Sequence, residues 1–255
     1  MADKKKTSEK VKKLRFEVIK TTPYWKSRII DRFEEMEEFK RFTFSAIDEE
    51  KKSVEEYLEE VTEGMSKEEL DEFYDWGGED HFMVKSVFEK TSLNSFIVIL
   101  YSYIEIGINT LCKGRYSDKR MEQMKKNKQA EDEGRKPEFK ELYGIKSADV
   151  KVKGGIIKRA KKYLEKEFDV SFDSVKEEWD EIIGLGKLRN SIVHNDGVDE
   201  KEDVEKDNKI KEHVKDGMLG ITGKNKLSYG RIVIKREYLD TILPVVRKFF
   251  SKLEV

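Results

Sequence analysis

The sequence predicts an all-α protein with a small β-hairpin near its C-terminus, and three observations support this prediction. Apolar residues recur mostly at three- to five-residue spacing over long stretches, which is typical of amphipathic helices. The 255 residues include only 3 prolines, so long helices are seldom interrupted. Charged residues make up 41% of the chain and apolar residues 37%, a balance that suits elongated helices better than a compact sandwich.

The N-terminal part predicts helices with an acidic solvent face. A loose apolar face over 8–20 predicts a short helix, and Thr21-Thr22-Pro23 is typical of a helix start. The apolar series over 25–61 then predicts one long helix or two in tandem. Ser66 and Glu69 have the spacing of a capping box, which predicts another helix.

A mainly apolar stretch, 82–112, follows and predicts a buried helix, although its β-branched residues leave a buried strand open. Its longest apolar run, 96–112, falls short of the ~20 apolar residues that a membrane span needs. Glu105 is the exception in this stretch: it either faces solvent at a helix edge or orients a cation such as Arg189. The charge-rich segment 116–143 predicts a short helix and then a loop near 134–137.

The C-terminal part predicts three more amphipathic helices, over 156–168, 172–193 and 237–253. The last of them contains Pro244, which predicts a kink. Two apolar runs, 218–222 and 229–234, flank a Gly-Lys-Asn-Lys turn and predict the hairpin.

Charge is strongly segregated along the chain. Residues 31–80 carry 20 acidic and 6 basic side chains, a local charge of −14, which we interpret as solvated helix faces. Residues 113–166 carry 18 basic and 9 acidic side chains, a local charge of +9, and this block is a candidate polyanion-binding face. Its basic helix supplies the candidate RNA-binding residues Lys158, Arg159, Lys161 and Lys162.

Composition and motifs exclude several kinds of site. The single cysteine, Cys112, excludes an intramolecular disulfide and a cysteine-based zinc cluster, and it is predicted to be a buried core residue. We find no metal, phosphate-loop or nucleophile-elbow motif, so neither a metal nor a cofactor is expected. His81 and His213 are predicted surface residues. Without an apolar segment of a signal peptide, the expected location is the cytoplasm, with no membrane partner.

The remaining polar constellation is Arg189, Asn190 and His194, near the end of a predicted helix that Asn195-Asp196-Gly197 terminates. An arginine fork suits a phosphate, and a histidine suits proton transfer at a ribose 2′-hydroxyl near neutral pH. Residues five apart on a helix point about 140° apart, so Arg189 and His194 do not share a face. Either Arg189 reaches round the helix, or two copies of the helix line one cleft.

The Arg-Asn-x-x-x-His sequence at a helix end, preceded by Gly-Lys-Leu and followed by Asn-Asp-Gly, resembles the signature of the HEPN superfamily. The resemblance implies a HEPN-like helical bundle over 91–255. Residues 1–90 have no counterpart in it, and we expect them to form an acidic helical region that is regulatory or dimer-building. It implies that Arg189 binds phosphate, that Asn190 is the polar residue after it and that His194 is catalytic.

The same resemblance implies a metal-independent endoribonuclease in a toxin–antitoxin or phage-defence setting. Its partners would be RNA, a second copy with the active site at the homodimer interface, and an antitoxin or regulatory protein. Some family toxins carry a modifiable tyrosine two residues after the histidine. Here that position is Asp196, a candidate supporting residue with Glu105, which puts this mode of control in doubt. The alternatives are a non-catalytic HEPN module that binds a nucleotide, RNA or protein, and a helical interaction protein in which the motif is a coincidence.

Overall fold

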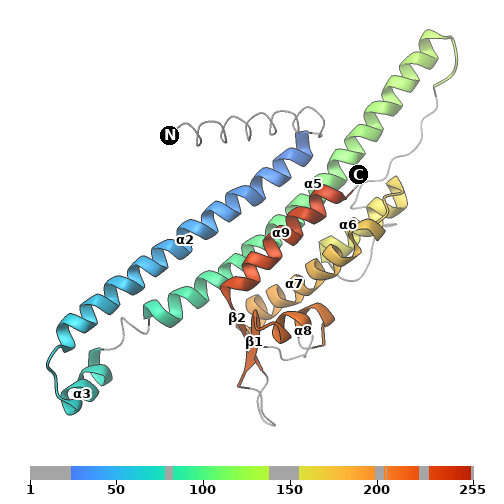
Figure 1. Ribbon diagram of the computed structural model, residues 1–255. Helices are drawn as coiled ribbons and strands as arrows, with labels where there is room; N and C mark the ends of the chain where they lie inside the picture. Colours follow the sequence, from blue (N-terminus) through green and yellow to red (C-terminus); the bar gives the residue numbers. More distant parts are fainter. Residues whose placement is uncertain are drawn as a thin grey trace, which may run out of the picture. The chain divides into compact units, whose positions relative to one another are not determined.

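The computed structural model describes residues 24–77, 83–137, 155–198, 204, 206–223 and 230–253 (Figure 1). Most of these residues are helical and two short strands pair, so the predicted all-α class and the C-terminal hairpin are confirmed. The longer helices are α2 (Tyr24–Thr62), α3 (Lys67–Gly77), α5 (Glu89–Asp132), α6 (Gly155–Phe168), α7 (Lys176–Asn195), α8 (Asn208–Lys215) and α9 (Arg236–Lys252). A π-helical turn, Met83–Phe88, precedes α5, and a 3-10 turn, Asp173–Val175, precedes α7.

The chain divides into two compact units. Unit 1 comprises Met1–Phe33, Ser102–Trp179 and Val246–Val255, and unit 2 comprises Glu34–Tyr101 and Asp180–Val245. Helices α2, α5, α7 and α9 therefore each contribute one part to unit 1 and another to unit 2. The division into 1–90 and 91–255 stays a prediction.

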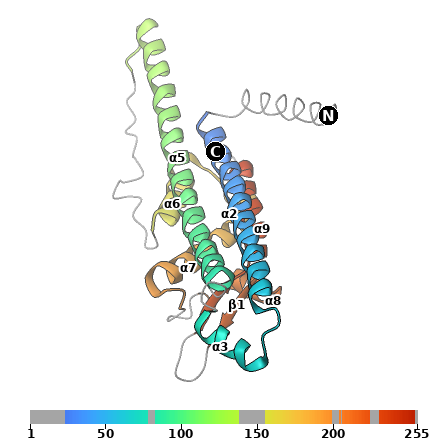
Figure 2. The ribbon, with the colours of Figure 1, turned by 90° about the vertical axis from the view of Figure 1, so that its left-hand side faces the viewer.

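The core of unit 1 depends on close helix contacts. Gly107 of α5 has no side chain, and a Cβ there would lie 2.8 Å from the ring of Phe250 in α9. The same Phe250 ring stacks on Phe33 of α2, with centroids 5.4 Å apart. One ring, Phe250, thus contacts both α2 and α5, and Gly107 leaves room for it; Figure 2 shows the ribbons of these helices.

Unit 2 is held together by apolar packing and by an ion cluster. Phe44 of α2 stacks on Phe96 of α5, with ring centroids 5.6 Å apart. Arg236, the first residue of α9, donates two hydrogen bonds of 2.8 Å to Asp48 of α2 and another to Glu89 of α5. Lys51 also pairs with Glu89, so four charges tie three helices together at the start of α9.

Several local predictions are confirmed by the backbone. The series over 25–61 forms one helix, α2. Ser66 and Glu69 form the reciprocal capping box at the start of α3, with bonds of 2.7 Å from the Ser66 N–H and 3.3 Å from the Glu69 N–H. The hairpin pairs β1 (Leu219–Thr222) with β2 (Arg231–Ile234) in antiparallel register. The predicted helix over 8–20 lies outside the described residues.

The predicted loop near 134–137 is confirmed, because the chain turns at Gly134, but the predicted short helix is not separate: α5 continues without interruption to Asp132. This segment is weakly amphipathic, so apolar periodicity did not reveal the continuous helix. Its lysine-, glutamate- and glutamine-rich composition has good intrinsic helix propensity, which is enough to extend a helix that is already nucleated.

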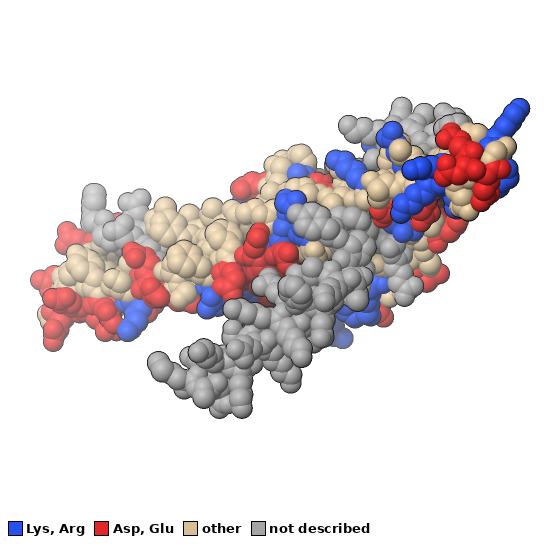
Figure 3. All heavy atoms as spheres, turned by 90° about the horizontal axis from the view of Figure 1, so that it is seen from above, with Lys and Arg blue, Asp and Glu red and all other residues tan. Residues whose placement is uncertain are grey.

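The distribution of charge on the surface matches the acidic block of the sequence but not the basic block. Asp and Glu atoms gather over α3 and the adjoining part of α2 in Figure 3, which agrees with solvated acidic faces. At the far end of α5 the two signs are mixed rather than forming one basic face (Figure 3). Among the described helices, Ser86–Asp132 passes a length and composition test for a membrane span. Buried core helices pass the same test, and 44% of its apolar window is buried inside the protein.

Candidate active site at the end of helix α7

Helix α7 carries the predicted Arg189-Asn190-His194 site, and its end is sharply fixed. Asp196 and Gly197 both adopt left-handed backbone conformations, with φ of 50° and 78°, which stops the helix. The N–H of Gly197 donates to the carbonyl of Ser191 at 3.0 Å, and the Ser191 hydroxyl donates to the carbonyl of Val198 at 2.9 Å. The chain therefore folds back against the last turns of α7.

Strand β2 braces this turn from the other side. The N–H of Ile232 donates to the carbonyl of Gly197 at 2.9 Å, and Val198 forms an isolated bridge with Arg231. The Arg231 guanidinium also pairs with the Asp196 carboxylate at 3.2 Å. Asp196, predicted as a supporting residue, therefore takes part in fixing the helix end to the hairpin.

Helix α8 holds the middle of α7 in place. Asp207 accepts hydrogen bonds from the N–H groups of Lys209 and Ile210 as the N-cap of α8. Its other carboxylate oxygen pairs with Lys187 of α7 at 2.8 Å. A Cβ on Gly184 would lie 3.3 Å from the Asp207 carboxylate, so this glycine lets α8 approach α7 closely.

A second glycine, Gly186, lies directly under Tyr101 of α5. A Cβ at this position would come within 2.8 Å of the Tyr101 hydroxyl and ring. This contact presses α5 against α7 one turn before Arg189. The two glycines that weaken α7 as an isolated helix thus permit its packing on both sides.

The three predicted catalytic residues remain accessible on this fixed helix. Asn190 and His194 are exposed, and Arg189 is half-buried. The Arg189 guanidinium donates a hydrogen bond of 3.1 Å to the Asn190 side-chain oxygen, while the Arg189 Nε is buried without a partner in the described part of the chain. No hydrogen bond or ion pair between described residues joins Arg189 to His194 within one chain.

A groove of about 620 Å³ runs beside these turns, between α7 and the start of α5. Ile192 and Asp196 of the α7 end line one side of it. Lys90 and Asn94 of α5, with neighbouring serine, threonine and valine side chains, line the other. The groove offers one cation and several neutral hydrogen-bonding groups next to the Arg189–His194 turns.

The other predicted residues belong to unit 1. Glu105 is half-buried on α5, so its predicted pairing with Arg189 of unit 2 stays a prediction. On α6, Lys158 is exposed and Lys162 is half-buried, whereas Lys161 lies over the rings of Phe172 and Trp179 at 5.1 and 5.3 Å.

Arg159 on the same helix is half-buried, and its buried Nε has no partner in the described structure. The α6 residues therefore form no uniformly exposed basic row, and their proposed contact with RNA stays a prediction.

Other reactive side chains lie in structural environments. Cys112 is buried, as predicted, and burial raises the pKa of its thiol to about 12, so it is a poor nucleophile near neutral pH. His213 was predicted on the surface, and this is wrong: it is only 5% exposed. Its Nε2 bonds to Glu181 at 2.8 Å, and its ring meets Tyr238 edge-on. His81 lies outside the described residues.

Sequence analysis missed the side chains that support α7. Asp207, Arg231 and Tyr101 come from three separate elements, and their proximity to α7 depends on tertiary packing. One local signal pointed to Asp207, because an aspartate before Asn208-Lys209-Ile210 is a typical helix N-cap.

Comparison of the chain with protein-family models, characterised proteins and solved structures finds no match. The HEPN resemblance therefore depends on the residues of α7 alone.

Proposed function

We propose that the chain is a metal-independent endoribonuclease that cleaves RNA by attack of a ribose 2′-hydroxyl on the adjacent phosphate. One observation supports this most directly: Arg189, Asn190 and His194 are accessible on a helix end that is fixed from two sides. A fixed helix end presents its side chains with little loss of conformational freedom on binding. The resemblance to HEPN proteins suggests a toxin or phage-defence role with an antitoxin or regulatory partner.

In the proposed reaction, Arg189 holds the scissile phosphate and His194 accepts the proton of the 2′-hydroxyl. The 2′-oxygen forms a bond to phosphorus, and the bond from phosphorus to the 5′-oxygen breaks. The leaving oxygen takes the proton from His194, which the 2′-hydroxyl has protonated, so the products are a 2′,3′-cyclic phosphate and a 5′-hydroxyl end. The groove beside Ile192 and Lys90 would hold nucleotides next to the scissile bond.

We further propose that two copies share each site in a homodimer. Arg189 and His194 point about 140° apart on one helix, whereas the step needs both side chains at one phosphate. A partner helix supplies the missing direction, so that Arg189 of one copy acts with His194 of the other. This arrangement is symmetric, so a dimer would have two equivalent sites.

Cleavage of a mixed-sequence RNA in EDTA tests the chemistry. Wild-type protein should leave cyclic-phosphate ends and should not cut the 2′-deoxy analogue, while His194→Ala and Arg189→Ala should be inactive. Val193→Ala, an exposed change on the same turn, is the matched control and should retain activity. RNA left equally intact by wild type and by both variants would refute the proposal.

Mixing the two inactive variants tests the shared site. If Arg189 of one copy acts with His194 of the other, each mixed dimer keeps one intact site. Random exchange should then restore about a quarter of wild-type activity. If both residues act within one chain, the mixture stays inactive, which would refute the shared site but not the ribonuclease.

The alternative is a non-catalytic module that binds a nucleotide, RNA or a protein. The bond between Arg189 and Asn190 favours it, because it occupies part of the guanidinium within the chain. Under this alternative, RNA binds wild type and His194→Ala equally and is not cut.

A further inference from the structure

A groove of about 500 Å³ in unit 2, here called the β2 groove, lies between strand β2 and the first turns of α5. Five consecutive residues, Arg231 to Lys235, line one wall with the first residues of α9. The other wall includes Ser86, Lys90 and Asn94, which also line the groove beside the α7 end, so the two grooves adjoin. Alternate side chains of a strand point to opposite faces, so a groove lined by consecutive residues runs along the edge of β2.

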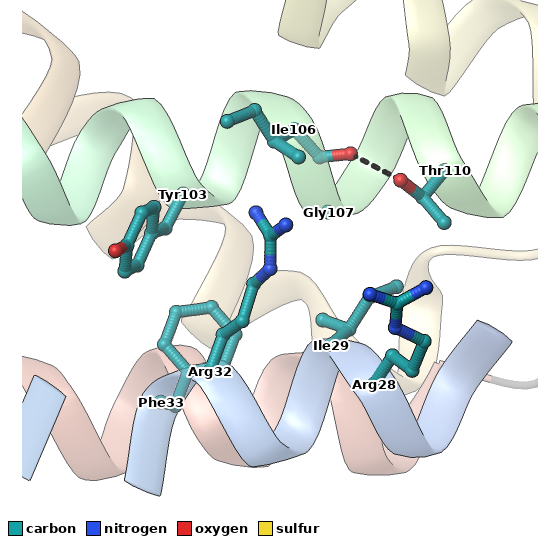
Figure 4. Close-up of a pocket in the computed structure, with 8 residues that line it drawn as sticks. All are labelled: Arg28, Ile29, Arg32, Phe33, Tyr103, Ile106, Gly107 and Thr110. Carbon is teal, nitrogen blue, oxygen red and sulfur yellow. Dashed lines mark hydrogen bonds between the residues drawn. The ribbon is translucent and has the colours of Figure 1, made fainter. Parts of the chain in front are cut away.

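The pocket between α2 and α5 in unit 1 provides a contrast (Figure 4). Both of its walls are helices, whose backbone hydrogen bonds are made within each helix, so side chains supply its surface. Two of these side chains contact each other, because the Arg32 guanidinium lies over the Tyr103 ring, 5.7 Å from the centroid. The β2 groove differs because one of its walls is a strand, which has backbone groups to offer at its edge.

The pairing of β2 leaves the N–H of Ile234 open at this edge. The N–H of Lys235 donates to the carbonyl of Met218 at 3.1 Å, so the odd-numbered residues of β2 bond towards β1 and the even-numbered residues point away. The N–H of Ile232 points away from β1 and donates to the carbonyl of Gly197 at 2.9 Å. The next N–H on this side belongs to Ile234, and it has no hydrogen-bond partner in the described chain. An edge strand with unpaired backbone groups is a template for another strand.

The side chains of the β2 groove fit a peptide that carries apolar and acidic residues. Leu93 of α5 and Val233 of β2 supply apolar surface, and Val233 is 40% exposed. Lys90 and Lys235 are exposed on opposite walls, and neither pairs with a carboxylate in the described chain. These two ammonium groups are therefore available to a carboxylate of a ligand.

The two carboxylates of the lining do not cancel these lysines. Glu89 pairs with Lys51 and with Arg236, so its charge is compensated. Glu237 lies in the first turn of α9, where the helix dipole favours a carboxylate. The β2 groove thus keeps an excess of positive charge.

We propose that the β2 groove binds an extended peptide, which adds as a strand to the free edge of β2 at Ile234 and carries a carboxylate for Lys90 and Lys235. Backbone hydrogen bonds supply affinity in this mode of recognition, and side chains supply specificity. A nucleic-acid strand would meet the two lysines, but it cannot extend a sheet, so the free edge favours a peptide. Peptide binding here does not depend on ribonuclease activity.

Retention of a peptide pool on the immobilised full chain tests the proposal. The pool consists of short, blocked peptides with glutamate at both ends, serine at alternate positions, and valine, isoleucine, leucine or threonine at random elsewhere. The control pool has lysine in place of glutamate. Mass spectrometry measures the retained peptides, and we expect the glutamate pool to be retained at least tenfold more. Equal retention of the two pools, or retention of neither, would refute the proposal.

Backbone methylation of the tightest-binding peptide tests strand addition. A strand at the edge of a sheet directs the N–H groups of alternate residues towards its neighbour and the others away from it. Methylation of one alternate set should weaken binding at least tenfold in fluorescence anisotropy, and methylation of the other set should leave it within about twofold. An equal effect of both sets would show that the peptide does not extend the sheet.

Lys235→Glu should weaken the binding of this peptide by about tenfold, because a carboxylate replaces the cation. Lys211→Glu makes the same change of charge at an exposed site on α8 in unit 2 and is the matched control. Both lysines are exposed, so both variants should melt close to wild type. The proposal fails if the two variants bind the peptide equally well. It also fails if Lys235→Glu weakens only the binding of a single-stranded 2′-O-methyl RNA, because the groove would then belong to nucleic acid.

Discussion

Two histidines in the described part of the chain occupy opposite environments. His213 is 5% exposed, bonds to Glu181 and meets Tyr238 edge-on, so its partners are all internal. His194 is exposed at the end of α7, and its side chain makes no hydrogen bond or ion pair with other described residues. Unit 2 therefore uses its buried polar contacts to fix its helices and leaves the Arg189–His194 turns open to solvent.

The polar contacts that hold α7 in place show the same contrast between buried and exposed groups. Lys187 with Asp207, and Ser191 with Val198, satisfy polar groups that face the interior of unit 2. Asn190 and His194 are instead among the exposed side chains of α7. If the two histidines have different roles, then substitutions at the two places should affect different measurements.

The largest effect is expected from His194→Ala. Removing a general acid–base group lowers the rate by about 10²–10⁴-fold. Because the side chain is exposed, the melting temperature should stay close to that of wild type. Single-turnover RNA cleavage and thermal denaturation on the same preparation measure both quantities. A variant that melts well below wild type would show that His194 is a structural residue like His213, and the contrast would fail.

The next effect is expected at the buried histidine. Glu181→Ala removes the partner of His213 Nε2 and leaves a buried polar atom unpaired, which costs about 2–3 kcal/mol of unfolding free energy. Urea denaturation measures this loss. Glu212→Ala is the matched control, because Glu212 is exposed and pairs with Lys209, which Glu181 also approaches. Equal unfolding midpoints for the two variants would contradict a structural role for the His213 pair.

A smaller, pH-dependent effect is expected where α9 meets α2 and α5. The hydrogen bond from Arg236 lowers the pKa of Asp48 below its usual 3.8. Burial alone would raise the pKa of Glu89, but hydrogen bonds from Lys51 and Arg236 outweigh burial and hold it below 4.5. Groups with lowered pKa values stabilise the fold above their unfolded pKa, and this stabilisation is lost as the pH falls through the lowered values.

Arg236→Met should therefore lose about 1–2 kcal/mol of unfolding free energy at pH 7, allowing for partial solvent screening. The difference from wild type should shrink as the pH falls below about 4.5, when the carboxyls become protonated. Urea denaturation between pH 7 and pH 3 measures it. A difference that stays constant over this range would indicate lost packing on Phe44, whose ring lies under the guanidinium, instead of lost charge.

The two histidines also show which features could be predicted from the sequence and which could not. Periodicity predicted α2, α6, α7, α9 and the hairpin, because each buries one face. It did not show that α5 continues from its apolar part to Asp132, because most side chains in the second half of this helix are exposed. The Arg189–His194 site could be predicted because its residues lie close together in the sequence. The burial of His213 was not, because it depends on contacts with Glu181 and Tyr238, 32 and 25 positions away.

The smallest effect is expected at the ion pair that links the α7 end to the hairpin. The Asp196 and Arg231 side chains are 82% and 43% exposed, so Asp196→Asn should cost less than about 1 kcal/mol of unfolding free energy. Asparagine also tolerates the left-handed backbone at this position, so the turn should persist. Urea denaturation and RNA cleavage on one preparation measure both consequences. If Asp196 only braces the turn, activity should stay close to wild type. A rate loss as large as that of His194→Ala, with stability unchanged, would instead show that the Asp196 carboxylate takes part in the reaction and does not only fix the end of α7.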